Sequence, residues 1–333
     1  MTPPDKADAP DEFELIAELF APLAATAPEA LALKDDAALY VPTPGYETVL
    51  TVDAMVEGVH FLSDDPAESV ARKLLRVNLS DLAAKGATPR GYLLVTAWRE
   101  GTPFAWMRDF ARGLAADQKI LGIALWGGDT VRTPGPASFT LTAIGDVPAG
   151  QMLRRGGASA GDGLYVTGTL GDAALGLMVL QGGLDGLGAT HRGYLAGRYR
   201  LPEPRVTAGG RLRGIASAAL DVSDGLMADL GHLCAVSDVG ARIDIERLPL
   251  SEAGREALAL DKGLIEAVAG GGDDYEILFA APAGSDAVLA RVAAETGTPI
   301  VRIGTVLPAA DGINPVDGAG RPAALKHLGY RHF

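Results

Sequence analysis

The chain has 333 residues, enough for two domains at the usual size of roughly 100–200 residues each. Its 29 Lys and Arg residues against 42 Asp and Glu residues give a formal charge of −13, so we expect neither nucleic acid nor an anionic membrane as a partner. One cysteine excludes an intrachain disulfide, and no apolar run reaches the roughly 18 residues of a membrane span, so we expect a cytoplasmic protein.

Periodicity and turn residues predict both helices and strands in the first part of the chain. Residues 1–10 are rich in proline and aspartate, and we expect them to be mobile. Asp11 is the predicted start of a helix. The apolar stripe of that helix is formed by Phe13, Ile16, Phe20 and Leu23. The other predicted elements are strands over 48–53, 91–98, 121–126 and 138–147 and helices over 66–85 and 103–119.

The second part continues in the same style, after a boundary near 148–152. The predicted strands are 163–167, a short one entering Asp221, 241–245, 275–281 and 299–306. The predicted helices begin at Asp172 and span 205–217 and 226–236, and 182–190 reads as a flexible loop. The alternation of strands and helices is irregular, so we predict an α/β protein with α+β-like mixed sheets rather than a doubly wound one. Its domains are expected over 11–148 and 149–333.

Several familiar catalytic signatures are absent. The sequence has no Gly-Lys dipeptide, which excludes the phosphate-binding loop of P-loop proteins, and it has no G-x-G-x-x-G. The protein-kinase motifs are missing too. Gly157–Gly161 matches G-x-S-x-G but precedes a strand instead of a helix, so Ser159 is not expected to be a nucleophile. The five histidines lack metal-ligand spacing, so zinc is not expected.

What remains is a series of aspartates beside glycines or after apolar runs. They are Asp35, Asp36, Asp53, Asp81, Asp129, Asp221, Asp224, Asp273 and Asp274. Carboxylates without His or Cys suit Mg²⁺. Glycine accounts for 43 of the 333 residues, a larger share than the usual ~7%, and glycines would let backbone N–H groups approach phosphates. The pattern predicts a magnesium–polyphosphate site, with Asp53, Asp129 and Asp221 at the carboxyl ends of strands.

A purely structural reading of single aspartates stays open. Asp224 can cap the helix 226–236, and Asp129 can be an ordinary turn residue. Asp81 is harder to explain in this way, because it continues the apolar face of Val70, Leu74 and Val77 inside a helix, where an unpaired carboxylate is costly.

The order of the motifs adds a resemblance that covers nearly the whole chain from about residue 11. The motifs are Asp35–Ala38, Thr51–Phe61, Val77–Ala84, Gly127–Thr130, Arg155–Asp162, Asp221–Leu226, Gly271–Glu276 and Gly329–Phe333. In this order they resemble the thiamine-monophosphate kinases of the aminoimidazole-ribonucleotide-synthetase superfamily. The resemblance implies the two-domain synthetase-like fold of that superfamily, a homodimer, and ATP-dependent phosphorylation of thiamine monophosphate to thiamine diphosphate.

The resemblance also assigns roles by motif position. The Mg²⁺ ligands it implies are Asp36, Thr51, Val52, Asp53, Asp81, Asp129, Asp221 and Asp224. The ATP contacts it implies are Gly128, Asp129, Arg155 and Ser223. The thiamine-phosphate contacts it implies are His60 and Asp273, with either Tyr330 or His327 packing on the thiamine.

Three residues depart from the family pattern. Lys34 replaces a glycine before the Asp35-Asp36 pair, Val52 replaces a threonine, and Asp273 replaces a glutamate that is one methylene longer. A metal contact at Val52 would therefore use its carbonyl oxygen. Cys234, inside a predicted helix, fits neither the selenophosphate synthetases nor the hydrogenase-maturation relatives, so we expect it to pack in the core.

Charge suggests the mechanism. Both reactants are anions that repel strongly in a poorly solvated site, so we expect several Mg²⁺ ions, direct in-line transfer and no general base. Two other functions use the same aspartates, namely a two-metal phosphohydrolase and a non-catalytic nucleotide- or cation-binding protein.

Overall fold

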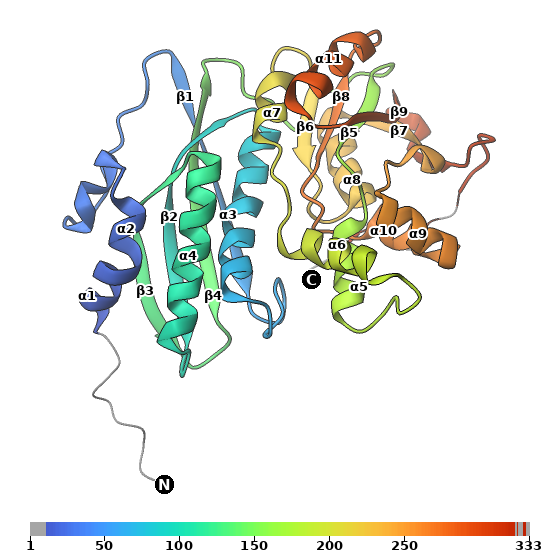
Figure 1. Cartoon of the computed structure of the whole chain (residues 1–333). Coiled ribbons are helices and arrows are strands. Elements are labelled where there is room, and N and C mark those ends of the chain that lie inside the picture. The colour runs from blue at the N-terminus through green and yellow to red at the C-terminus, as the bar shows by residue number, and fades with distance from the viewer. Residues whose placement is uncertain (1–10, 324, 326–328, 331–333) are drawn as a thin grey trace. The chain divides into compact units, whose positions relative to one another are not determined.

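The computed structural model describes residues 11–323, 325 and 329–330, and its helices and strands fall into two compact units (Figure 1). Unit 1 comprises Met1–Asn78 and Pro89–Asp146, and unit 2 comprises Leu79–Thr88 and Val147–Phe333. Each unit has its own sheet with helices packed on it, which confirms the predicted α/β class with mixed sheets. The predicted mobile segment 1–10 and the candidate His327 lie outside the described residues.

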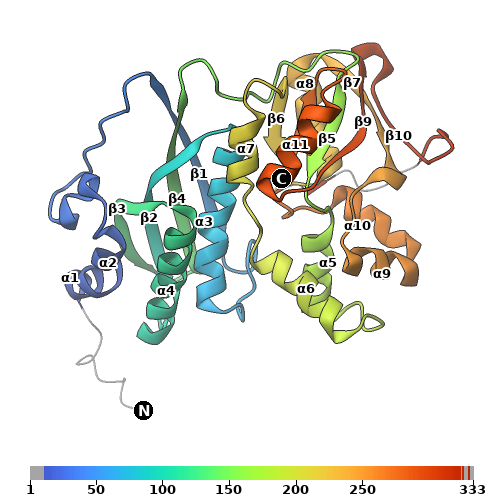
Figure 2. The same ribbon diagram turned by 45° about the horizontal axis from the view of Figure 1, so that its top comes forward.

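Unit 1 is built on a four-stranded sheet with the order β1-β4-β2-β3. The strands are β1 (Tyr46–Val56), β2 (Thr88–Arg99), β3 (Ala124–Thr133) and β4 (Ser138–Pro148). The helices are α1 (Glu12–Leu15), α2 (Ala21–Ala24), α3 (Ala67–Ala84) and α4 (Phe104–Leu121). Helices α3 and α4 lie along one face of this sheet (Figures 1 and 2). The predicted helices 66–85 and 103–119 are confirmed, and Gly86, with φ +67°, follows the end of α3.

The N-terminal helix starts where the sequence predicts it and buries part of the predicted apolar stripe. Asp11 accepts the N–H of Glu14 at 2.8 Å, and Glu14 accepts the N–H of Asp11 at 3.1 Å, which is a capping box. Phe13 is nevertheless 79% exposed and Ile16 is half-buried, while Phe20 and Leu23 are buried together with the unpredicted Leu15 and Leu19. A π-helical turn over Ile16–Phe20 separates α1 from α2. Its wider turn breaks the 3.6-residue periodicity on which the predicted stripe depended.

Two strands of unit 1 continue past their predicted ends. The strands predicted over 48–53 and 121–126 run on to Val56 and Thr133, so Asp53 and Asp129 lie inside β1 and β3 and not at strand ends. In β3 the glycines remain in the ladder because β2 and β3 pair in parallel as far as Arg99 and Thr133. A Cβ on Gly128 would lie 1.8 Å from the Leu94 carbonyl oxygen, so glycine is required here by sheet packing.

Aromatic packing and a buried charge cluster join the helices of unit 1 to its sheet and to each other. Trp98 of β2 contacts Phe110 of α4 at a ring-centroid distance of 5.3 Å, and its indole N–H donates to the Thr130 hydroxyl at 2.9 Å. Asp117 of α4 is fully buried and accepts from Arg72 of α3 at 2.9 Å and from Arg76 at 2.5 Å. The two guanidinium groups supply the hydrogen bonds that make this buried carboxylate tolerable.

Unit 2 is built on a six-stranded sheet with the order β10-β7-β9-β5-β8-β6. The strands are β5 (Gly163–Thr167), β6 (Ala218–Asp221), β7 (Val239–Asp244), β8 (Ile277–Ala281), β9 (Ile300–Pro308) and β10 (Ile313–Val316). Only the β10–β7 pair is parallel among the pairs of this sheet, and β10 was not predicted. Strands β5 and β8 are buried throughout, as expected for a sheet covered on both faces.

Helices cover both faces of this sheet. They are α5 (Asp172–Leu180), α6 (Ala189–Arg200), α7 (Val206–Leu212), α8 (Leu226–Ser237), α9 (Glu252–Leu260), α10 (Ile265–Gly270) and α11 (Asp286–Thr296). Leu278 packs in a core with residues of α5, α6 and α8, and its neighbour Phe279 packs in a second core with Leu212 of α7 and Leu289 of α11. Successive side chains of β8 therefore enter opposite cores.

The helix predictions for unit 2 succeed only in part. Those starting at Asp172 and Leu226 are confirmed, but the helix predicted over 205–217 ends at Leu212, because Arg213 is extended and Gly214 has φ +73°. Helices α6, α9, α10 and α11 were not predicted. In α6 two glycines and only two buried residues weaken the apolar stripe that reveals a helix in sequence.

Asp117 offers a test of the packing between α3 and α4. Asp117→Ala leaves two partly buried guanidinium groups without their carboxylate, and we expect the free energy of unfolding to fall by about 3–5 kcal/mol. Urea denaturation followed by circular dichroism measures the change. The matched control is Glu18→Ala, which removes the exposed ion pair with Arg108 and should cost less than about 1 kcal/mol. Equal losses in both variants would contradict this role of Asp117.

Candidate functional site

The predicted site residues fall into two sets, one in each unit. In unit 1, Thr51 and Asp53 lie on the same side of β1 as the buried Met55, while Val52 points to the opposite side and is exposed. The backbone N–H of Asp53 donates to the Asn78 side-chain oxygen on α3 at 3.1 Å. Asn78 is itself fully buried, so it fixes the strand at the aspartate.

Asp129 lies on a different part of the same sheet. It is exposed and pairs in register with Val95, whose side chain is on the face not covered by α3 and α4. Asp53 lies on the covered side of β1, and β1 and β3 are the two edge strands of the sheet. Three interstrand spacings of roughly 4.8 Å separate these edges, about 14 Å in all. Unit 1 therefore does not bring Asp53 and Asp129 to one ion, since metal–oxygen distances are close to 2 Å.

The other unit 1 candidates lie in short connecting segments. Asp36 is exposed, and its N–H donates to the Asp35 carboxylate at 2.8 Å. His60 follows β1 in a turn, where its Nδ1 accepts the N–H of Val56 at 3.1 Å and its carbonyl oxygen accepts from Lys73 at 3.0 Å. The first bond orients the His60 ring, and the second ties its backbone to α3.

In unit 2 the C-terminal part of α3 lies beside the end of β6. Asp221, the last residue of β6, is buried and accepts the Ser80 hydroxyl at 2.7 Å. Lys85 donates to the Ala219 carbonyl oxygen at 2.8 Å. Burial lowers the pKa of Lys85, the charges of Asp221 and Asp81 act to raise it, and that of Arg155 acts to lower it. The charges of Asp81, Asp221 and Arg155 in unit 2 thus lie close enough to Lys85 to affect its pKa.

Two glycine-rich loops of unit 2 run side by side next to Asp221. The N–H of Asp273 donates to the Ser223 carbonyl oxygen at 2.9 Å, and that of Tyr275 donates to the Val222 carbonyl oxygen at 2.8 Å. A Cβ on Gly272 would lie 2.3 Å from the Ser223 oxygen, so only glycine permits this approach. The structure therefore brings the predicted ATP contact Ser223 next to the predicted substrate contact Asp273.

Asp224 has two further backbone and side-chain partners. Its carbonyl oxygen accepts the N–H of Tyr330 at 2.9 Å, which holds the exposed ring of Tyr330 near this loop. Its own N–H donates to Asp229 of α8 at 3.1 Å. Burial raises the pKa of Asp229 to about 7, and the charge of Asp224 acts in the same direction. The alternative in which Asp224 caps α8 is wrong, because Gly225 occupies the cap position and no side-chain hydrogen bond caps that helix end.

Several residues of the site were not predicted as functional. They are Asn78, Ser80, Lys85, Asp229 and Glu276. Asn78 and Ser80 stand three and one residues before Asp81, inside the motif Val77–Ala84. Their position next to Asp81 on one predicted helix was the signal that could have identified them. Asp229 had no such signal, because its contact depends on how α8 meets the loop.

The donor chemistry of both sets fits Mg²⁺. The candidate side chains are almost all carboxylates or hydroxyls, which are the oxygen ligands that Mg²⁺ prefers. Among the described residues, neither unit gathers three or more His, Cys, Asp or Glu side chains that could hold a metal by themselves. Mg²⁺ is usually held by one or two carboxylates and completes its shell with water and substrate phosphates, so the sets suit an ion that binds together with a phosphate.

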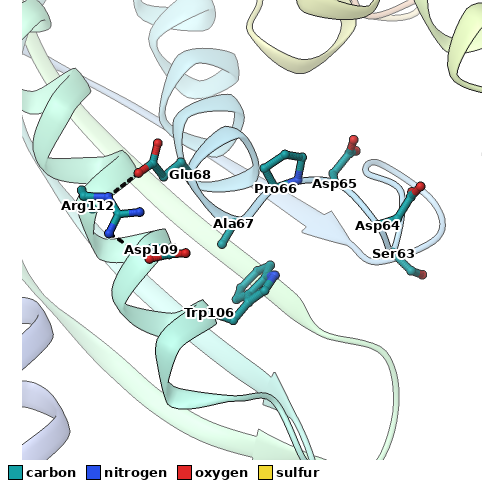
Figure 3. A pocket seen from close by; sticks show the side chains of 9 residues that line it. All are labelled: Ser63, Asp64, Asp65, Pro66, Ala67, Glu68, Trp106, Asp109 and Arg112. Atoms are coloured by element: carbon teal, nitrogen blue, oxygen red, sulfur yellow. Dashed lines mark hydrogen bonds and ion pairs between the residues drawn. The ribbon is translucent and has the colours of Figure 1, made fainter.

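A hollow of about 550 Å³ in unit 1 is separate from these candidates (Figure 3). Trp106 and the start of α3 line it, together with four acidic side chains. Two of these, Glu68 and Asp109, pair with Arg112 (Figure 3), and Asp65 accepts the N–H of Leu62 at 2.8 Å. Three of its four acidic side chains already have hydrogen-bond or ion-pair partners in the protein, so we do not treat the hollow as a catalytic site.

Comparison with known proteins identifies the class. The family model described as AIR synthase related protein, N-terminal domain, matches residues 34–147, and the C-terminal domain model matches residues 159–313. The chain is 45% identical to thiamine-monophosphate kinase of Caulobacter vibrioides, over 97% of this chain and 91% of that protein.

Solved structures agree with this result. The crystal structure of thiamine-monophosphate kinase from Stenotrophomonas maltophilia K279a is 40% identical, with a TM-score of 0.83 over 94% of this chain and 98% of that chain. The structure of AaThiL complexed with AMPPCP and TMP is 28% identical, with a TM-score of 0.76 over 88% and 89%.

The two sheets and the two matched domains define a two-domain protein of the AIR synthase related class, as the sequence predicts. Within that class, the chain belongs to the thiamine-monophosphate kinase family. In the part of the chain that the structure describes, no helix is long and apolar enough to cross a membrane.

Cys234 lies in the core of unit 2 and not among these loops. It is 4% exposed on α8, and burial raises the pKa of its thiol to about 11. At pH 8 only on the order of 0.1% would be the reactive thiolate. We therefore expect iodoacetamide to modify the native protein at least about 100-fold more slowly than the urea-unfolded protein, as measured by mass spectrometry. Similar rates in both states would contradict the packing role of Cys234.

Proposed function

We propose that the protein transfers the γ-phosphoryl group of ATP to thiamine monophosphate and releases thiamine diphosphate. The observation that carries this proposal is 45% identity to a thiamine-monophosphate kinase over 97% of the chain. The paired loops of unit 2 support it, because they bring Ser223 and Asp273 side by side through a direct backbone hydrogen bond. The structure of the relative AaThiL with AMPPCP and TMP is consistent with a two-substrate site of this kind.

The central chemical problem is repulsion between two phosphates. A phosphate monoester carries about −1.5 to −2 charges at neutral pH, and ATP carries more. Bound Mg²⁺ would offset the charge of both reactants and align their oxygens for in-line displacement. Since the acceptor oxygen is already largely ionised, the chain needs no general base, and none is proposed.

We assign the Mg²⁺ ligands to aspartates in both units. They are Asp36, Asp53 and Asp129 in unit 1, with Thr51 and the Val52 carbonyl oxygen, and Asp81, Asp221 and Asp224 in unit 2. The distance between the edge strands that carry Asp53 and Asp129 requires more than one ion if both bind metal in one chain. This agrees with the need for several ions when the acceptor is itself an anion.

Other side chains orient these ligands and the nucleotide. Ser80 donates to the Asp221 carboxylate and so restricts its rotation. Asn78 holds the backbone of β1 at Asp53. From the family motifs we assign ATP-phosphate contacts to Arg155 and Ser223 in unit 2 and to Gly128 and Asp129 in unit 1. The Cβ-free backbone of Gly128 already packs on Leu94, so its contribution to phosphate binding is its N–H group.

Thiamine monophosphate is assigned to His60 and Asp273, with Tyr330 packing on the thiamine ring. Asp273 is half-buried, and its N–H is held by Ser223. Its shorter side chain, compared with the usual glutamate of the family, demands a closer backbone approach. The exposed ring of Tyr330 lies on the same loop system through its bond to Asp224.

The decisive experiment is incubation with Mg-ATP and thiamine monophosphate, followed by chromatography for thiamine diphosphate. Its formation in step with ADP supports the proposal. ATP turnover that ignores thiamine monophosphate would indicate a phosphohydrolase instead. Tight ATP binding without turnover of any acceptor would indicate a binding protein, and a trapped phosphoenzyme would contradict direct transfer.

Removing single carboxylates tests the metal assignment. Asp53→Asn and Asp129→Asn keep size and shape but lose the charge that binds Mg²⁺, and we expect kcat/KM to fall at least about 100-fold. Circular dichroism should show an unchanged fold. The matched control is Asp64→Asn, an exposed unit 1 aspartate outside the proposed set, which should retain activity. Wild-type rates in either site variant would remove that residue from the set.

We also propose a cytoplasmic homodimer that forms through the open face of the unit 1 sheet. The face opposite α3 and α4 presents a row of exposed apolar side chains from three strands. They are Leu50 and Val52 of β1, Leu93 and Val95 of β2, and Val131 of β3. Exposed apolar side chains on one face of a sheet are typical of an interface, and a second copy would bury them on both partners. A reducing cytoplasm suits the single, buried, free Cys234.

Charge placed on this face should separate the subunits. The double variant L50K/L93K puts one cation on each of two strands of the proposed interface, and we expect a monomer in sedimentation equilibrium where the wild type is a dimer. The control is Ile120→Lys, which adds a cation at a similarly exposed apolar position on α4. A wild-type monomer, or a dimer that survives both lysines, would overturn this interface.

A further inference from the structure

The segment Gly271–Glu276, between α10 and β8, has an unusual backbone. Asp273 has φ 72° and Tyr275 has φ 52°, so two non-glycine residues adopt the left-handed conformation with one residue between them. Such conformations are unfavourable for residues with a Cβ and persist only where the surroundings impose them. They are often found where a backbone must direct a side chain to a ligand.

One side of this segment is held by the neighbouring loop. The N–H groups of Asp273 and Tyr275 donate to the carbonyl oxygens of Ser223 and Val222, at 2.9 and 2.8 Å. These bonds fix where the segment lies, but each uses only backbone atoms. They do not explain why the residue between the two left-handed positions is a buried aspartate.

The other side is held by the side chain of Asp274. This residue is 1% exposed, and its two carboxyl oxygens accept separate N–H groups, from Gly171 at 2.6 Å and from Ala173 at 3.2 Å. These donors belong to the N-terminus of α5, a nine-residue helix whose first N–H groups have no partner within the helix. The residue at the cap position, Gly171, has no side chain that could accept these N–H groups. Asp274 therefore acts as the capping residue from a distant part of the chain.

Glu276, two positions after Asp274, is a second anchor of the segment. Glu276 is fully buried and accepts from the Thr167 hydroxyl at 2.7 Å and from Arg205 at 2.7 Å and 2.6 Å. Asp274 and Glu276 therefore point into the interior of unit 2. Asp273 and Tyr275, which alternate with them, remain half-buried. The anchored residues thus hold the backbone immediately after Asp273.

We propose that Asp274 is a positioning residue for thiamine monophosphate. By tying the segment to the N-terminus of α5, its carboxyl group imposes the left-handed conformation at Asp273 and so directs the Asp273 side chain to the substrate. This inference rests on the proposed function for the identity of the substrate. The anchor itself rests only on the contacts within unit 2.

Asp274→Asn is the sharpest variant, because an amide has one oxygen acceptor where a carboxyl group has two. One of the two N–H groups of α5 would then face an NH₂ group, and the segment should lose one tether. We expect the KM for thiamine monophosphate to rise at least about 10-fold, while the KM for ATP changes less than about twofold. Amide hydrogen exchange in a peptide covering 271–276 should become faster.

The chain offers a matched control in Asp172. This carboxylate is equally buried and close to the same helix end, but it accepts only side-chain hydroxyls, from Ser251 at 2.5 Å, Thr169 at 2.6 Å and Tyr194 at 3.2 Å. Asp172→Asn should lower thermal stability and leave the KM for thiamine monophosphate within about twofold of wild type. If Asp274→Asn does not yield folded protein, Asp274→Ser keeps one acceptor and should show the same change in a milder form.

The outcomes separate the possibilities. Equal increases in both KM values, or the same increase in Asp172→Asn, would assign Asp274 to fold stability and overturn the proposal. Unchanged KM and exchange in Asp274→Asn would overturn it as well. If the wild type does not convert thiamine monophosphate, the proposed function fails, and faster exchange in 271–276 still decides whether Asp274 anchors the segment.

Discussion

Burying a carboxylate is costly unless hydrogen-bond donors or positive charge surround it, and this constraint shapes both units. Asp117 is held between two arginines, Glu276 receives Arg205 and Thr167, and Asp221 receives the Ser80 hydroxyl. Each of these contacts joins elements that are distant in sequence. The compensation of acidic groups therefore does more than remove a penalty, because it fixes which elements pack against each other.

The same constraint separates two kinds of aspartate in a chain with a net charge of −13. Fully buried ones, such as Asp172 and Asp274, are satisfied by hydroxyl or N–H donors of the protein. The proposed metal ligands mostly lie at half-buried or exposed positions, where a cation and a phosphate can reach them. Asp221 stands between these groups, since it is buried but lies at a strand end beside the loop of Ser223.

Local patterns predicted much of this arrangement. The capping signal at Asp11, the helix ending before Gly86 and the strand ending at Asp221 are all confirmed, because each depends on neighbours in sequence. The prediction that Asp53 and Asp129 end their strands is wrong, since pairing with adjacent strands carries both strands further. Glycine next to Asp129 suggested a turn, but its lack of a side chain serves the close approach of β2.

The sequence by itself determined the class of fold, the family and the set of acidic motifs, because these follow from residue types in a fixed order. Only the tertiary structure decided what surrounds each aspartate. It placed Asp53 and Asp129 on opposite edges of one sheet, and it gave Asp274 its partners at the start of α5, about a hundred residues away. Such partners come from strand order and helix packing, which depend on contacts between residues far apart in the chain and leave no local pattern to read.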